Sequence, residues 1–459
     1  PIISILLISL VSCKKDSLIT SGDARLNISA DSIRFDTVFT SVGSVTQSFK
    51  IRNDNEQMLR LSNVKLMGGS SSAFKINING TAANELSNID IAAEDSIYVF
   101  VSVTVDPTAA NLPFILSDSI SVQYNGNQRW IQLEAYGQNA RFMNGSIISS
   151  NTTWTNTQPY VILDFLNVAP GATLTIQPGT KIYSHANAPI IIDGTLNATG
   201  TADNKIIFAG DRLDAPYKDY PAGWPGIIFR SGSINNHLQF AAIKNAYQAI
   251  VVDQPASNVN PKLRLEQCII DNAFDAGIFS INSSITASNL LISNCANNIA
   301  IQGGGIYNFT HCTAASFSNN FLLHKTPALS LSNYTTVNGA PVSNSLQAAF
   351  TNCIFWGDNG FVENEIVINK EGASPFAVTI NNSLYRAAVD PANANFANSL
   401  KNQDPLFDSI DVSNKYYDFR HTKSAAPGIN TGIATPINKD LDNNNRPVGL
   451  PDMGCYEVQ

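Results

Sequence analysis

The chain has 459 residues, a formal net charge of −8 and 14% charged residues. This length suits two or three domains, and the acidic balance argues against nucleic-acid binding, which requires a basic surface. No apolar stretch reaches the roughly 20 residues that a transmembrane helix needs.

The first segment, residues 1–13, has the pattern of a lipoprotein signal peptide. Its apolar run, Ile2 to Val11, has a length typical of the apolar region of such peptides. The run ends in Leu10-Val11-Ser12-Cys13, which resembles the lipobox of bacterial lipoproteins. The resemblance implies that the Cys13 thiol is acylated and anchors the protein in a membrane; the alternative is a buried apolar segment with a chance cysteine.

Residues 14–24 are predicted to form a polar tether. Their start, Lys14-Lys15-Asp16, resembles that of lipoproteins of Bacteroidetes, in which basic and acidic residues after the cysteine favour export to the outer face. The resemblance implies an outer-membrane protein, exposed on the cell surface, with the periplasmic face as the alternative.

Residues 25–140 show short alternating strands separated by turns. The segment Ile97 to Val103 alternates strongly, and Asn125-Gly126 is a hairpin signal. About seven strands over this length predict a β-sandwich. The order of features, from Phe39 to Tyr136-Gly137, resembles immunoglobulin-like domains, which implies a spacer or a binding module.

Residues 145–410 contain a loose repeat, in which apolar triplets such as Ile190-Ile191-Ile192 recur every ~20–30 residues. Asn and Gly are frequent between them and suit tight corners, because both tolerate left-handed backbone geometry. The stretch Pro170 to Thr180 and the stretch Trp224-Pro225-Gly226-Ile227 resemble right-handed parallel β-helix proteins of the pectate-lyase-like kind. The resemblance implies an all-β protein with a solenoid of about ten turns.

Residues 411–459 are expected to cap this solenoid, since its last turn would otherwise be exposed. Together with Asp404-Pro405-Leu406-Phe407, the end Asp452-Met453-Gly454-Cys455-Tyr456-Glu457 resembles the closing segment of many Bacteroidetes β-helix proteins.

The densest polar insertion, Asp211 to Pro221, is the first candidate ligand site. Aromatic faces with flanking carboxylates suit sugar rings, while the alternative is a solvated loop. Trp356 is a second candidate, as an exposed aromatic residue before a turn. The predicted ligand-binding residues are Asp211, Asp214, Tyr217, Asp219, Tyr220, Trp224 and Trp356.

Asp440, Asp442 and Asn444 alternate as the first ligands of a Ca²⁺ loop do, although Pro451 stands where such a loop has glutamate. A structural Ca²⁺ is therefore possible, with a plain turn as the alternative, and no other cofactor is expected. The five histidines are scattered, so we assign no catalytic residue and no zinc site. Four cysteines in the repeat are predicted to be small buried residues.

We expect a non-catalytic surface lipoprotein that binds glycan or another surface component through the repeat. The alternatives are a polysaccharide lyase or glycoside hydrolase, and a structural accessory of an outer-membrane assembly, with a polysaccharide or an outer-membrane protein as partner. Carboxylates that converge with Lys or Arg in one groove would favour the enzyme. A groove of aromatic and amide side chains would favour binding.

Overall fold

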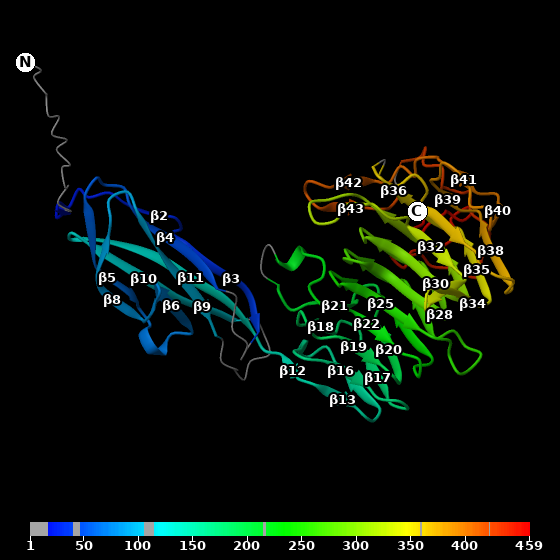
Figure 1. The fold of residues 1–459 in the computed structure, drawn as a ribbon, viewed down its shortest axis with the longest axis horizontal. Coiled ribbons are helices and arrows are strands. Elements are labelled where there is room, and N and C mark those ends of the chain that lie inside the picture. Colours follow the sequence, from blue (N-terminus) through cyan, green and yellow to red (C-terminus); the bar gives the residue numbers. More distant parts are fainter. Residues whose placement is uncertain (1–16, 40–45, 105–113, 214–216, 359, 422) are drawn as a thin grey trace, which may run out of the picture. The chain divides into compact units, whose positions relative to one another are not determined.

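The structure is a computed structural model that describes residues 17–39, 46–104, 114–213, 217–358, 360–421 and 423–459. Cys13 and Asp214, two of the predicted site residues, lie outside the described residues. The chain divides into two compact units, Pro1–Asn139 and Ala140–Gln459. In the described part, nearly all regular structure is β, and no helix is long and apolar enough to cross a membrane (Figure 1).

The first unit consists of two sheets that share one hydrophobic core. Its strands bury every second side chain: in β9, Val99 and Val101 are fully buried, whereas Tyr98 and Phe100 are exposed. The predicted hairpin is confirmed, since Asn125 and Gly126 both have positive φ and join two paired strands. One sheet contains β1 (Leu18–Ile19), β5 (Met58–Leu66), β10 (Phe114–Tyr124), β11 (Asn127–Gln138) and β3 (Ser32–Phe39), with β8 (Glu85–Ile91) paired to β5. The other contains β2 (Leu26–Ile28), β4 (Gln47–Asn53), β9 (Ser96–Val103), β6 (Phe74–Ile78) and β7 (Thr81–Ala82), and η1 (Gly69–Ser71) follows β5.

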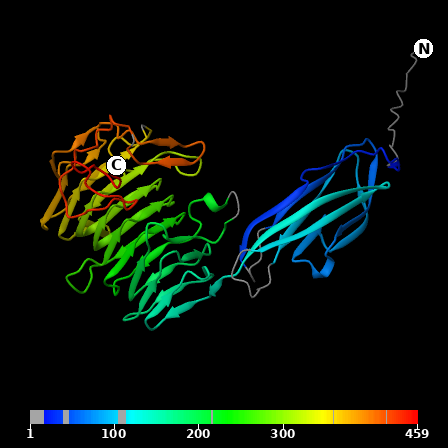
Figure 2. The same cartoon turned by 180° about the vertical axis from the view of Figure 1, so that it is seen from behind.

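The second unit contains two large sheets of parallel strands, in a solenoid-like arrangement consistent with a β-helix (Figures 1 and 2). Each strand pairs with the equivalent strand of the next turn, as β15 pairs with β18 and β18 with β21. The 11-stranded sheet is formed by β12 (Arg141–Met143), β15 (Tyr160–Ile162), β18 (Lys181–Ser184), β21 (Ile206–Gly210), β24 (Ala241–Lys244), β27 (Ile269–Asp271), β29 (Leu291–Ser293), β31 (Thr313–Ser316), β36 (Ile354–Gly357), β39 (Leu384–Tyr385) and β41 (Leu400–Lys401).

The 17-stranded sheet starts as two parallel rows, which join where β28 and β30 each extend across both rows. Its strands are β13 (Ser146–Ile148), β14 (Thr152–Trp154), β16 (Leu166–Val168), β17 (Thr173–Ile176), β19 (Ile190–Ile192), β20 (Thr195–Thr199), β22 (Ile227–Phe229), β23 (Asn236–Gln239), β25 (Gln248–Asp253), β26 (Leu263–Glu266), β28 (Ala276–Ser288), β30 (Asn297–Thr310), β32 (Leu329–Ser332), β35 (Leu346–Thr351), β37 (Ile366–Asn369), β38 (Phe376–Asn381) and β40 (Asn395–Ala397). Two antiparallel hairpins complete the unit: β33 (Tyr334–Val337) with β34 (Ala340–Ser343), and β42 (Ser409–Asp411) with β43 (Tyr416–Asp418).

The apolar triplets supply the core, since Ile190 and Ile192 are buried while Ile191 between them is less so. The polar corner residues on both sides of the 11-stranded sheet have positive φ, a conformation that Asn tolerates better than most residues. The first corner ladder, before the strands, is Gln267, Asn289, His311, Asn352 and Asn382. The second corner ladder, after the strands, is Asn245, Asn272 and Asn294.

The segment after Asp404 covers the outer face of the later strands of the 11-stranded sheet. Phe407, Phe419 and Met453 pack there against Leu291 and Ile354, in a cluster separate from the solenoid core. Apolar residues on this outer face of the sheet are thereby removed from water, which stabilises the segment's attachment.

The same segment is hydrogen-bonded to the first corner ladder. Ladder amides donate to its main-chain carbonyls, from Gln267 to Asp440 (2.8 Å) and from Asn289 to Lys439 (2.7 Å). Asn352 donates to the Ile433 carbonyl (2.8 Å) and Asn382 to the Thr431 carbonyl (3.2 Å). The segment therefore crosses several turns of the solenoid along one corner.

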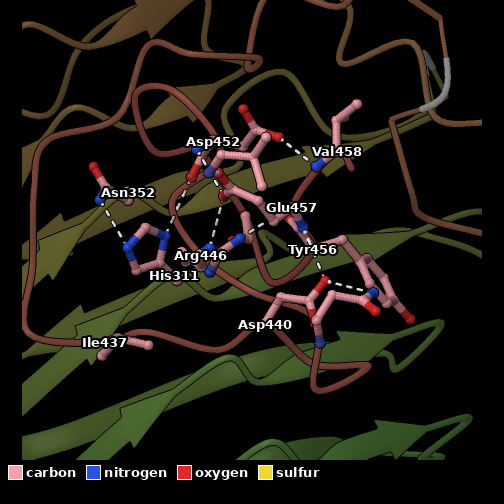
Figure 3. Close-up of polar contacts among 12 residues, drawn as sticks. His311, Asn352, Ile437, Asp440, Arg446, Asp452, Tyr456, Glu457 and Val458 are labelled. Carbon is pink, nitrogen blue, oxygen red and sulfur yellow. Dashed lines mark hydrogen bonds and ion pairs between the residues drawn. The ribbon is translucent and has the colours of Figure 1, made fainter.

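A buried ion pair fixes the end of this segment (Figure 3). The Arg446 Nε lies 2.8 Å from Glu457 Oε2, and neither side chain is exposed. Arg446 Nη1 also donates to Asn289 Oδ1 (2.7 Å), so a corner residue of the solenoid shares the same guanidinium. Breaking a buried pair leaves an uncompensated charge, which makes this contact important for the attachment of the segment.

Candidate functional site

A pocket of ≈ 230 Å³ lies where the C-terminal segment stops covering the 11-stranded sheet. We call it the hairpin pocket, because the β42–β43 hairpin borders it on one side and the loop with η2 (Tyr217–Asp219) borders it on another. These two elements lie on the same side of the second unit in both views (Figures 1 and 2). The lining residues are Lys218, Asp219, Lys244, Asn245, Asp271, Asn272, Asn294, Asn319, Asn320, Phe321, Val412, Lys415 and Tyr417.

The second corner ladder forms the polar base of the pocket and holds the η2 loop. Asn272 Nδ2 donates to Asn245 Oδ1 (2.8 Å) and to the Asp219 carbonyl (3.0 Å). Asn245 Nδ2 donates to the Lys218 carbonyl (2.6 Å). The regular spacing of corner residues thus supplies a row of amides that fixes the main chain around Lys218 and Asp219.

An ion pair joins the two sides of the pocket. Lys415 Nζ, at the tip of the hairpin, lies 3.0 Å from Asp219 Oδ2 and 4.6 Å from the Phe321 ring centroid. The Tyr220 ring packs on Phe321 with 5.0 Å between centroids, and Tyr217 packs on Tyr220 at 5.3 Å. The rim therefore carries a continuous aromatic surface beside a cation.

The remaining charged groups are Lys218 in η2 and two residues of strands β24 and β27. Lys244 and Asp271 are register partners on these neighbouring strands, at the end of each strand. Asp271 Oδ1 accepts hydrogen bonds from Ser293 Oγ (2.7 Å) and Asn294 Nδ2 (3.4 Å). Burial raises the pKa of Tyr417, so this phenol is neutral at physiological pH.

The pocket can hydrogen-bond a ligand rich in hydroxyl groups and can also attract a negative group. Its amides both donate and accept, its ammonium groups donate, and its aromatic rings offer apolar faces. Among the residues that the structure describes, no group of three or more His, Cys, Asp or Glu side chains could hold a metal ion.

Three of the predicted ligand residues lie at or beside the hairpin pocket. Asp219 lines it, Tyr220 is 36% exposed and packs on Phe321, and Tyr217 is 45% exposed and packs on Tyr220. Arg212 stacks over the Tyr217 ring at 3.8 Å. The aromatic and acidic insertion thus contributes to a pocket, but mainly through its second half.

Two other predicted residues, Asp211 and Trp224, are not among those that line this pocket. The Trp224 side chain is only 1% exposed and its Nε1 donates to the Lys244 carbonyl (2.8 Å), so it belongs to the core and offers no face to a ligand. Asp211 is hydrogen-bonded to His185 Nδ1 (2.8 Å). Burial raises the Asp211 pKa, and the contact with His185 opposes this rise.

Trp356 lies at a different pocket of ≈ 350 Å³. Its side chain is half-buried and packs on the cluster under the C-terminal segment. This second pocket also contains carboxylates and one lysine, contributed by Asp358, Asp404, Asp408 and Lys423. The polar insertion Asp211 to Pro221 and Trp356 therefore do not form a single site.

The predicted Ca²⁺ ligands already have protein partners. Asp440 Oδ1 accepts from the Asn444 N–H (2.7 Å), and Asp442 Oδ2 accepts from Arg420 Nη2 (2.6 Å). Burial raises the pKa of Asp440. A Ca²⁺ ion would have to displace these donors in order to bind here.

The sequence interpretation missed Phe321, Lys415 and Tyr417 as members of a site. The recurrence of Asn at the end of successive strands was a usable signal for the base of the pocket. Nothing in the sequence shows that the hairpin tip meets the η2 loop, since Lys415 and Asp219 are 196 residues apart.

No protein-family model matches the chain, and no curated protein matches it. Several solved structures match it, and two of them illustrate how weak the likeness is. A protein of unknown function from Porphyromonas gingivalis W83 is 16% identical at a TM-score of 0.19, over 25% of this chain and 46% of that chain. A family 123 glycoside hydrolase from Clostridium perfringens is 12% identical at a TM-score of 0.18, over 24% of this chain and 25% of that chain. The chain thus spans less than half of either protein, and such low TM-scores support no statement about fold or function.

Proposed function

We propose that this protein binds glycan through the hairpin pocket without catalysis, because both carboxylates of the pocket are already engaged by protein donors. The observation that supports the proposal is the combination of a row of corner amides, three lysines and the Tyr220–Phe321 aromatic pair around one pocket. Sugars are recognised by hydrogen bonds to their hydroxyl groups and by stacking of their apolar faces on aromatic rings.

In this proposal the second unit, which contains the pocket, is a right-handed parallel β-helix of the pectate-lyase-like kind, similar to that of Bacteroidetes lipoproteins. The first unit is an immunoglobulin-like spacer. A lipid on Cys13 anchors the protein in the outer membrane, on the cell surface. Replacing Cys13 by serine should abolish labelling by a radioactive fatty acid and release the protein from the membrane fraction. Unchanged labelling would reject the lipid anchor and leave the proposed glycan binding by the pocket untouched.

Binding is tested with polysaccharides immobilised in native gels, in which a bound protein is retarded. Phe321→Ala and Tyr220→Ala should each weaken the affinity for the polysaccharide that binds the natural protein, by about tenfold or less. The weaker affinity is measured as reduced retardation in the gel. Tyr247→Ala is the matched control, because Tyr247 is 47% exposed and stacks on Phe274 outside the pocket. Equal effects of all three replacements would refute binding at the hairpin pocket.

A polysaccharide lyase or glycoside hydrolase is the second candidate function. The observation in its favour is that the hairpin pocket combines the carboxylates of Asp219 and Asp271 with Lys218, Lys244 and Lys415. Incubation with uronic-acid and neutral polysaccharides, followed by ultraviolet absorbance of unsaturated products and by reducing ends, tests this. Turnover that Asp271→Asn abolishes would replace the binding function by an enzymatic one.

The structural Ca²⁺ stays a prediction. It requires that calcium raise the thermal stability of the natural protein and not that of a variant with Asp440→Asn. A melting temperature that is unchanged by calcium or by a chelator would reject it.

A further inference from the structure

The electrostatic balance of the hairpin pocket differs from that of the whole chain. The chain has a net charge of −8, whereas the pocket is lined by three lysines and two aspartates. Lys415 is paired with Asp219, and Asp271 accepts hydrogen bonds from Ser293 and Asn294. The two carboxylates of the pocket are thus already engaged by protein donors.

Two ammonium groups are left over. Lys218 and Lys244 have exposed side chains, and neither ammonium group forms an ion pair or hydrogen bond within the described part of the chain. Lys244 stands at the end of β24, and Lys218 is held above the corner ladder by the bond from Asn245 to its carbonyl. Both ammonium groups are available to a ligand in the pocket.

The pocket is also small and closed on two sides. Its volume of ≈ 230 Å³ is below the range of about 300–1,000 Å³ that is usual for drug-sized ligands. The η2 loop and the hairpin border it, and the contact of Lys415 with Asp219 joins them. A single sugar unit at the end of a chain can enter such a space, whereas a long groove is needed to hold an internal stretch.

We infer that the hairpin pocket selects one terminal sugar unit that carries a negative group, a carboxylate or a sulfate, which Lys218 and Lys244 pair. This inference rests on the proposed glycan binding and adds the class of ligand. The aromatic rim and the corner amides contact the ring and its hydroxyl groups, and the two ammonium groups distinguish an acidic sugar from a neutral one.

The test uses the full chain and calorimetric titration with two disaccharides of the same linkage. One ends in glucuronic acid at the non-reducing end and the other in glucose. We expect the acidic disaccharide to bind about fivefold more tightly, a modest preference because exposed ion pairs are weak. The preference should vanish between about 0.01 M and about 1 M salt, as the Debye length falls from ~30 Å to ~3 Å.

The variant Lys218→Met/Lys244→Met should bind both disaccharides equally, since methionine keeps much of the side-chain length without the charge. Lys181→Met, in β18 of the same sheet, is the control and should keep the preference. An otherwise identical disaccharide that carries a terminal sulfate should behave as the glucuronate does. A polymer of glucuronic acid should bind in proportion to its chain ends and not to its length.

The outcomes separate the inference from the proposed function. Equal binding of glucose and glucuronate ends by the natural protein would overturn the inference and leave glycan binding intact. Binding of inorganic sulfate as tightly as of the acidic disaccharide would also overturn it, because the pocket would then be a simple anion site. Failure of every saccharide to bind would reject the proposed function and the inference together.

Discussion

Replacing Arg446 by methionine should loosen the C-terminal segment from the first corner ladder. The guanidinium pairs with Glu457 at 2.8 Å, donates to Asn289 at 2.7 Å and is fully buried. Methionine fills much of the same space but supplies no charge and no donor. Glu457 would then be buried with two donors among the described residues, the N–H groups of Val448 (2.8 Å) and Asp452 (3.0 Å).

The size of the effect follows from the burial of the pair. Removing one partner of a buried ion pair costs about 3–5 kcal/mol. A repeat protein need not unfold in one step. We therefore expect the substitution to lower the free energy of local opening of the C-terminal segment. At about 1.4 kcal/mol per factor of ten, the amides of the segment should exchange about 100- to 5,000-fold faster.

Hydrogen–deuterium exchange followed by mass spectrometry measures this opening directly, in peptides that cover residues 430–459. Arg420→Met is the matched control, because Arg420 is 46% exposed and its pairs with Asp418 and Asp442 lie at the surface. Exposed pairs contribute about 0–1 kcal/mol, so the control should change exchange less than about tenfold. If Arg446→Met matched the control, the assignment of a structural role to the buried pair would be refuted.

Three further predictions concern buried groups of the second unit. Trp224→Ala should cost about 3–5 kcal/mol in chemical unfolding, as expected for a core residue; a loss below about 1 kcal/mol would contradict its burial. Burial lowers the His311 pKa from 6.5 to about 3, so an unfolded chain binds the proton first and stability should fall as pH drops from 6.5 towards 3, by as much as about 4 kcal/mol. His311→Asn should flatten this dependence in thermal unfolding measured over a pH series, and an unchanged slope would reject the assignment. The thiols of the described cysteines should resist a disulfide reagent until the protein is unfolded, since all of them are buried and burial raises the pKa of Cys268 to about 12; rapid labelling of the folded protein would refute this. These cysteines are Cys268, Cys295, Cys312, Cys353 and Cys455.

Neutral His311 fits its surroundings, which gives the pH prediction its physical basis. Asn352 Nδ2 donates to His311 Nε2 (3.0 Å), and the opposite ring nitrogen, Nδ1, lies 3.2 Å from the Asp452 carbonyl oxygen. A ring that accepts on one nitrogen and donates from the other carries one proton only. Adding a second proton would turn the amide contact into a clash of two donors.

The sequence predicted the parallel, all-β character of the second unit because its signals are local. Triplets such as Ile190 to Ile192 show which side chains point inward, and Asn at the corners shows where the chain must turn. The alternation in Ile97 to Val103 likewise predicted a half-buried strand in the first unit. Such patterns need no knowledge of distant parts of the chain.

The candidate site was predicted only in part, because it depends on contacts between distant segments. Asp219, Tyr217 and Tyr220 were found by the density of polar and aromatic residues in one loop. Trp224 was included by its position beside that loop, although the strand that follows it draws the indole into the core. Lys415 has no local signal at all, since its role arises from a contact across 196 residues.

The bonds between the C-terminal segment and the first corner ladder have a consequence for how the protein is made. A solenoid whose turns contact only their neighbours can form turn by turn as the chain emerges. Here the hydrogen-bond partner of Gln267, the carbonyl of Asp440, lies 173 residues later in the chain. The partner of Asn289, Arg446, lies 157 residues later. The early corner residues therefore stay without these partners until residues 439–446 have been synthesised. A chain truncated before residue 439 should keep its stacked strands and lose the hydrogen bonds of Gln267 and Asn289 to the C-terminal segment.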